Sequence, residues 1–201
     1  MPKPFSESER TYIKNRLMEE AQVCLIHFGM RKTTVDELVK RVNIPKGTFY
    51  LFYPSKEALF FDIFCTLQNE LQAALLDWID ELQGNVNADT ITELIFQLYK
   101  QVDSTFLYPF ISNGDLELMM RKLPPEVVKE HTQTDDFSME RLISLLPGVQ
   151  AKENVKLFSA ALRAIFCTML HKREIGEDIF DDTVRVMLRG VVLQLFEGER
   201  L

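Results

Sequence analysis

Hydrophobic residues recur at helical spacing along most of this chain, and the pattern predicts an all-α protein. Long apolar stripes with i, i+3, i+4 spacing run over residues 6–28, 55–83, 89–106, 151–172 and 178–197. Shorter helices are expected at residues 115–122, 126–131 and 137–146. The chain holds eight Gly and eight Pro, too few for a β protein built on tight turns. We therefore expect about nine helices in total.

Residues 33–56 predict two short helices joined by a tight turn. The first covers residues 35–42, where apolar side chains lie on one helix face. Either Thr33 or Thr34 can cap it, since each has an acidic residue three positions later. Asn43 stands where the chain must reverse, and Asn tolerates the left-handed conformation better than most residues.

The second short helix, residues 45–52, has two unlike faces. The side expected to pack on the preceding helices carries Pro45, Thr48, Phe49 and Phe52. The outer side carries Lys46, Gly47, Tyr50 and Leu51. A cation, a bare backbone, a phenol and a leucine suit the major groove of DNA, where helix-turn-helix proteins insert their second helix. The alternative is a plain helical hairpin whose outer Lys and Tyr are only solvated.

The order of these residues resembles the DNA-binding domain of the TetR family of bacterial transcriptional regulators. The resemblance covers about residues 10–64 and rests on Thr33-Thr34, Gly47-Thr48-Phe49-Tyr50 and Pro54-Ser55-Lys56-Glu57-Ala58-Leu59. It implies a three-helix N-terminal domain followed by a helical ligand-binding domain that dimerises. Two positions depart from the family pattern: Asn43 replaces a usual Gly, and Phe52 replaces a frequent His that could bind phosphate.

DNA contacts can be assigned within this segment. Lys46, Tyr50 and Leu51 are expected at base edges, with Leu51 against a thymine methyl. Thr34, Thr48 and Lys56 are expected at phosphates, and Lys56 stands at a helix N-terminus that itself attracts anions. Gly47 allows close approach of the backbone. The predicted DNA-binding residues are Thr33, Thr34, Lys46, Gly47, Thr48, Tyr50, Leu51 and Lys56.

Charge is divided unevenly along the chain. Residues 1–56 hold ten Lys and Arg against six Asp and Glu, a net +4, which leaves −11 for the remainder of a chain whose total is −7. A basic head on an acidic body orients the head toward phosphate. The double-stranded DNA operator is therefore the expected macromolecular partner.

The sequence predicts a cytoplasmic protein. It contains no apolar run of about 18 residues, the length a membrane helix needs, and no signal peptide is visible. Its three cysteines are far apart and read as buried reduced thiols. We expect no cofactor and no metal, because no Cys or His pair has metal-site spacing.

We predict a DNA-binding domain at residues 1–54 and a ligand-binding and dimerisation domain at residues 55–201. The helix predicted at residues 55–83 would link them. The expected effector is a small apolar or aromatic molecule, because the middle region is rich in Phe, Tyr and Met. The predicted ligand-binding residues are Phe64, Gln68, Phe96, Tyr99, Met119, Phe137 and Phe166. Each of these side chains could instead simply fill the core.

The last two predicted helices are apolar on more than one side. Such helices must bury a second face, and a copy of the same chain is the simplest partner, which predicts a homodimer. The predicted dimer-interface residues are Phe158, Leu162, Val184, Leu188, Val191 and Leu195.

A ligand-responsive transcriptional regulator, most simply a repressor, is the predicted function, and an enzyme is not expected. The three His residues are far apart, and the chain has no phosphate-cradling Gly loop and no HExxH helix. Two other classes stay open: a helical adaptor or interaction protein without sequence-specific DNA binding, and a small all-α enzyme whose groups meet only in space.

Overall fold

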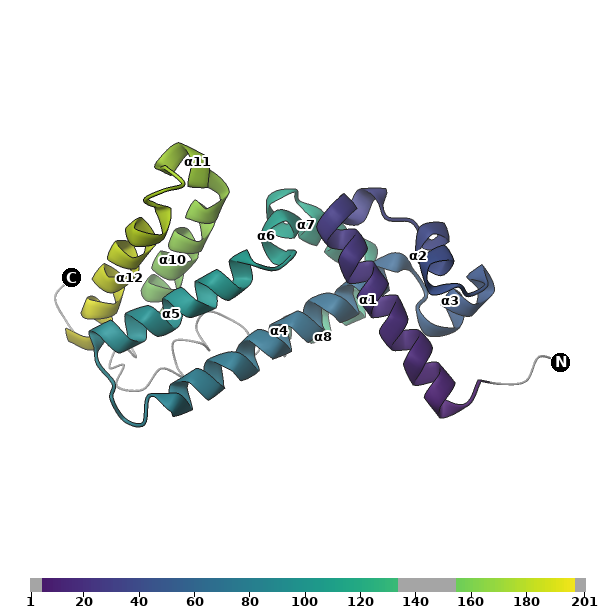
Figure 1. Ribbon diagram of the computed structural model, residues 1–201, viewed down its shortest axis with the longest axis horizontal. Helices are drawn as coiled ribbons and strands as arrows, with labels where there is room; N and C mark the ends of the chain where they lie inside the picture. The colour runs from purple at the N-terminus through teal and green to yellow at the C-terminus, as the bar shows by residue number, and fades with distance from the viewer. Residues whose placement is uncertain (1–4, 134–154, 198–201) are drawn as a thin grey trace. The chain divides into compact units, whose positions relative to one another are not determined.

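Every regular element that the computed structural model describes, in residues 5–133 and 155–197, is helical (Figure 1). The all-α prediction is confirmed, while the helix predicted at residues 137–146 lies outside the described residues. The elements are α1 (Glu7–Lys32), α2 (Val35–Val42), α3 (Lys46–Phe52), α4 (Lys56–Glu81), α5 (Ala88–Asp103), α6 (Leu107–Ser112), α7 (Asp115–Lys122), α8 (Pro125–Gln133), α10 (Val155–Cys167), η1 (Thr168–His171), α11 (Lys172–Ile175) and α12 (Phe180–Glu197).

The chain forms two compact units. The described part of the first unit is residues 5–67 with Thr105–Gln133, and that of the second is Gln68–Ser104 with residues 155–197. Helix α4 contributes residues to both. The units do not follow the predicted boundary after residue 54, because a segment far along the chain packs with the N-terminal helices. The functional division at that boundary stays a prediction.

Helix α1 begins and ends where local signals place it. Ser6 and Glu9 form a capping box at its start, with 2.8 Å between the Ser6 amide and Glu9 Oε2. Gly29, with φ 73°, interrupts the helix, which resumes for the three residues up to Lys32. Phe28, the last residue before Gly29, is 47% exposed. Its ring lies under the Arg41 guanidinium, 5.7 Å from ring centroid to Cζ, at the surface of the unit.

The core of the first unit joins α1, α2, α3 and the start of α4. Leu17, Leu38, Phe49 and Leu59 are each fully buried there. Figure 1 shows α2 and α3 side by side next to α1, with α6 and α7 at the other side of the α1 C-terminal end. Asn43 adopts the left-handed conformation, φ 58° and ψ 49°, and ends α2 as predicted.

In the second unit, α12 packs against α5 and α10 (Figure 1). Ion pairs cross between α5 and α12, for example Arg189 to Asp89 at 2.9 Å. The single helix predicted over residues 151–172 is corrected: α10 ends at Cys167, and a tighter 3₁₀ turn follows. At that turn the Thr168 hydroxyl donates to the Ile165 carbonyl oxygen at 2.6 Å.

The three cysteines have different surroundings. Cys24 is buried, Cys65 is half-buried and Cys167 is exposed, so the prediction of buried thiols is wrong for Cys167.

None of the helices in residues 5–133 and 155–197 combines the length and hydropathy that a membrane span requires.

Candidate nucleic-acid interface

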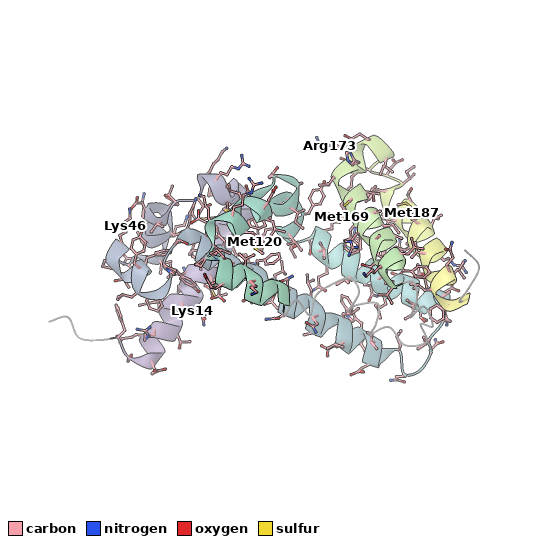
Figure 2. All side chains as sticks on the ribbon, turned by 180° about the vertical axis from the view of Figure 1, so that it is seen from behind. Lys14, Lys46, Met120, Met169, Arg173 and Met187 are labelled. Atoms are coloured by element: carbon pink, nitrogen blue, oxygen red, sulfur yellow. The ribbon has the colours of Figure 1, made fainter. Side chains whose placement is uncertain are left out.

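The outer face of α3 is the largest concentration of predicted DNA-binding residues on the surface. Tyr50 is 51% exposed and Leu51 is 61% exposed. Lys46 extends from the same face at the outer edge of its unit (Figure 2). The inner face is narrower than predicted: Thr48 and Phe49 are buried, whereas Pro45 is exposed and Phe52 is half-buried. Thr48 therefore has little surface left for the phosphate contact predicted for it.

Glycine at position 47 is not required by the fold. A Cβ added to Gly47 would meet no atom within 4 Å, and its backbone is not left-handed. A small residue on an exposed helix that needs no small residue for its own packing is consistent with close approach by another molecule.

The start of α2 settles which threonine is the cap. The Thr34 hydroxyl accepts from the Glu37 amide at 3.2 Å and is the N-cap. Thr33 is 1% exposed, and its hydroxyl donates to the Gly29 carbonyl oxygen at 2.8 Å. The expected DNA contact by the Thr33 side chain is therefore corrected, because that side chain closes the end of α1 instead.

Lys46 has a carboxylate partner that the sequence did not reveal. Its Nζ lies 2.9 Å from Asp36 Oδ1 and 3.0 Å from Asp36 Oδ2, so one side chain from each of α2 and α3 meet at the surface. The hydrogen bond and the negative charge of Asp36 raise the pKa of Lys46. The lysine is fully charged at neutral pH.

Lys56 points inward, which corrects its predicted role at a phosphate. Its Nζ donates to the Thr33 carbonyl oxygen at 2.6 Å and to the Met30 carbonyl oxygen at 2.9 Å. Carbonyls at a helix C-terminus lack intrahelical partners, and the ammonium satisfies them. Burial lowers the pKa of Lys56.

The short stretch after Gly29 is held by a buried carboxylate from α7. Asp115 Oδ2 accepts from the Met30 amide at 3.1 Å, and Oδ1 lies 3.2 Å from Arg31 Nε. Arg31 also donates to the Asn113 carbonyl oxygen at 3.3 Å. Because only 5% of the Asp115 side chain is exposed, its hydrogen bond with the Met30 amide is shielded from water, whereas Arg31 is 67% exposed. The contact joins residues more than 80 positions apart, so no local pattern in the sequence reveals it.

The C-terminal end of α3 is also fixed. The Tyr53 hydroxyl donates to Asp62 Oδ2 at 2.7 Å, and the same oxygen lies 2.9 Å from Lys14 Nζ. Burial, reinforced by the hydrogen bond to Asp62, raises the pKa of the Tyr53 hydroxyl, which stays neutral. Residues from α1, from the end of α3 and from α4 thus meet at one carboxylate.

The predicted ligand-binding residues divide between the units. Phe64 and Met119 belong to the first unit, and Gln68, Phe96, Tyr99 and Phe166 belong to the second. Phe137 lies outside the described residues. Their assignment to one ligand-binding site remains a prediction.

The predicted dimer residues are mostly core residues of the chain itself. Val191 is half-buried, and the other five, Phe158, Leu162, Val184, Leu188 and Leu195, are at most 6% exposed. This corrects the assignment: a side chain already packed inside its own unit has little surface left for a second copy.

Taken together, the three N-terminal helices and the exposed face of α3 define a helix-turn-helix protein. Residues 17–63 match the model of a family described as bacterial regulatory proteins, tetR family. Over 59 residues the chain is 41% identical to YhgD of Bacillus subtilis strain 168, described as an uncharacterized HTH-type transcriptional regulator. That match spans 29% of this chain and 31% of the relative. Through this N-terminal segment, the chain is similar to bacterial regulatory proteins of the TetR family.

Solved structures share the fold over nearly the whole chain. Thermus thermophilus FadR, a TetR-family repressor in complex with lauroyl-CoA, gives a TM-score of 0.58 at 18% identity, covering 94% of this chain and 95% of that one. FadR of Bacillus subtilis, in complex with stearoyl-CoA, gives 0.59 at 12% identity, covering 92% and 99%. A TetR-family regulator from Marinobacter aquaeolei VT8 gives 0.60 at 14% identity, covering 92% and 98%. At these identities the likeness shows the all-α fold.

Proposed function

We propose that this chain is a DNA-binding transcriptional regulator that reads the major groove with α3. The observation that supports it best is the outer face of that helix. Lys46, Tyr50 and Leu51 are exposed side by side, while Phe49 anchors the opposite face in the core. The amine and phenol can bind base edges, and the leucine can contact a thymine methyl. Thr34, exposed at the α2 N-terminus, remains a candidate for a phosphate.

The working form is a homodimer, with the contact on the outer faces of α10 and α12. Exposed apolar side chains remain on both helices after their inner faces are packed: Leu157 is 50% exposed and Val186 is 73% exposed. Small exposed residues, Ala160, Ala164 and Gly190, lie on the same two helices and permit close helix approach. Two copies related by a two-fold axis would present two α3 helices to half-sites about 34–36 Å apart or somewhat more.

The proposed output is repression relieved by a small apolar or aromatic effector. Tyr99 is fully buried among three rings, with centroids 5.9 Å from Phe96, 5.7 Å from Phe166 and 6.2 Å from Phe180. Such an aromatic core suits an apolar guest. The acyl-CoA complexes of the two FadR proteins make acyl-CoA one class worth testing here. By linkage, an effector that weakens DNA binding must itself bind more weakly to the DNA-bound protein, by the same factor.

The experiment is selection of DNA by the purified full chain from a pool of random duplexes, followed by gel shift. The promoter beside its own coding region serves as a second probe. We expect a near-palindromic consensus and a complex of two chains per duplex. Equal, salt-sensitive binding to every sequence would contradict the proposal and favour the adaptor alternative. Release of the duplex by acyl-CoA or by aromatic compounds then tests the effector.

A further inference from the structure

Asp36 and Lys46 place an acceptor and a donor next to each other on the proposed DNA-reading surface. Asp36 comes from the first turn of α2, and Lys46 is the first residue of α3. Both are open to water, with 73% of the Asp36 side chain and 51% of the Lys46 side chain exposed. An ion pair this exposed contributes little to folding. An acidic residue in the first turn of a helix adds at most about 1 kcal/mol through the helix dipole, and Glu37 occupies the same turn, so stability gives only a weak reason for a second carboxylate beside Lys46.

A carboxylate on a surface that must approach DNA has an electrostatic cost. It repels phosphates and occupies the ammonium that would otherwise neutralise one. Both effects weaken binding to every sequence equally. A carboxylate on this surface favours operator binding if its hydrogen bond to the correct base pair contributes more binding free energy than its repulsion of the phosphates costs.

The major-groove edge of a C·G pair offers the complementary pattern. Cytosine presents its N4 amino donor, and guanine presents the O6 and N7 acceptors beside it. Watson–Crick pairing holds N4 and O6 about 2.9 Å apart, the usual length of an N–H···O hydrogen bond. Asp36 Oδ1 and Lys46 Nζ are 2.9 Å apart, so one can accept from N4 while the other donates to O6 and N7.

We propose that Asp36 is a specificity-determining residue, which with Lys46 reads one C·G base pair in each operator half-site. The inference rests on the proposed DNA-binding function. The orientation of the pair is fixed, because reversing it would set the ammonium against the N4 amino group and the carboxylate against O6. An A·T pair also offers a donor beside an acceptor, but the thymine methyl replaces the second acceptor that the ammonium would find on guanine.

The test measures binding of wild type, Asp36→Ala and Glu37→Gln to the selected operator and to duplexes in which each half-site position is changed. Glu37 is the matched control. It is in the same first turn of α2, its loss changes the net charge equally, and it pairs with Arg41 at 2.7 Å instead of with Lys46. Thermal unfolding verifies that each variant is folded. Because Asp36 is exposed, its substitution should not prevent folding.

For wild type, one C·G position should lose about tenfold or more in affinity when changed to any other pair. In Asp36→Ala the penalty at that position should fall below about threefold, while penalties at other positions persist. Glu37→Gln should keep the wild-type pattern, and both variants should bind non-operator DNA somewhat more tightly.

Three results would overturn the inference: an unchanged penalty in Asp36→Ala, equal relaxation in both variants, or a relaxed position that is not C·G. A wild-type protein that selects no sequence would overturn the proposed function as well, and that outcome is visible before any variant is made.

Discussion

Asp115 accepts a hydrogen bond from the backbone amide of Met30 at 3.1 Å, although the two residues are 85 positions apart in the sequence. The contact joins α7 to the three helical residues after Gly29, which lead directly into the cap of α2. Nearby, Lys122 of α7 lies 2.9 Å from Glu57, in the first turn of α4. Helix α7 is therefore held by polar contacts to the segment before the helix-turn-helix, at Met30, and to the segment after it, at Glu57.

Asp115→Ala should destabilise the protein by about 1–3 kcal/mol, because it leaves a buried amide without its acceptor. Chemical denaturation at neutral pH measures this. Glu117→Gln is the matched control on the same helix, since its carboxylate is 72% exposed and pairs with Arg121 at the surface. The control should stay within about 0.5 kcal/mol of wild type. Equal stability of the two variants would show that the α7 contact does not hold the α1 end.

Glu57 should make stability depend on pH in one direction. Burial by itself raises the pKa of Glu57, but the hydrogen bond from Lys122, the backbone N–H and the charges of Lys122 and Lys56 outweigh it and lower the pKa below its ordinary 4.5. A carboxyl with a lowered folded-state pKa contributes stability above its unfolded pKa and loses it as pH falls through the folded value.

Glu57→Gln should therefore be less stable than wild type by about 1 kcal/mol at pH 7. This difference should stay constant from pH 7 down to about 5 and shrink below about 4.5. Urea denaturation across this range measures it. A difference that grows as the pH falls would mean that the carboxylate is not stabilised in the folded protein.

Gly47→Ala should affect stability and DNA binding in opposite directions. Alanine is the better helix former, and the added methyl meets no protein atom, so stability should rise by about 0.5 kcal/mol. If the backbone at position 47 approaches DNA closely, operator affinity should fall by about tenfold. Thermal unfolding and fluorescence anisotropy test the two effects separately. Unchanged affinity would remove Gly47 from the contact surface.

Val186→Glu tests the dimer surface. Val186 is 73% exposed, so the change should leave the protomer folded while placing a charge in the proposed contact between α12 helices. Sedimentation should then show monomers. Arg173→Glu is a control on a side chain that is 90% exposed in α11, and it should remain dimeric. Dimers in both variants would place the interface elsewhere.

Local features of the chain could be predicted from sequence because their causes are local. The capping box at Ser6, the left-handed Asn43 and the outward Lys46 and Tyr50 follow from helical spacing and from the preferences of single residues. The same reasoning gave the all-α fold.

Contacts between distant segments could not be predicted in this way. A lysine near a helix start suggested a phosphate contact for Lys56, but its amine binds carbonyls more than 20 residues earlier. Periodicity also cannot say which of two apolar stripes faces the core. Leu188 was therefore assigned to the dimer, whereas the stripe still exposed on that helix carries Val186.

The most direct test of the central claim, that the outer face of α3 binds DNA, is to measure operator affinity and thermal stability together for Tyr50→Ala. Phe49→Ala, at the adjacent fully buried position, is the control and should cost about 3–5 kcal/mol of stability. We predict that Tyr50→Ala binds the selected operator at least about tenfold more weakly. Its melting temperature should stay within about 2 °C of wild type. Unchanged operator affinity in Tyr50→Ala would contradict the account.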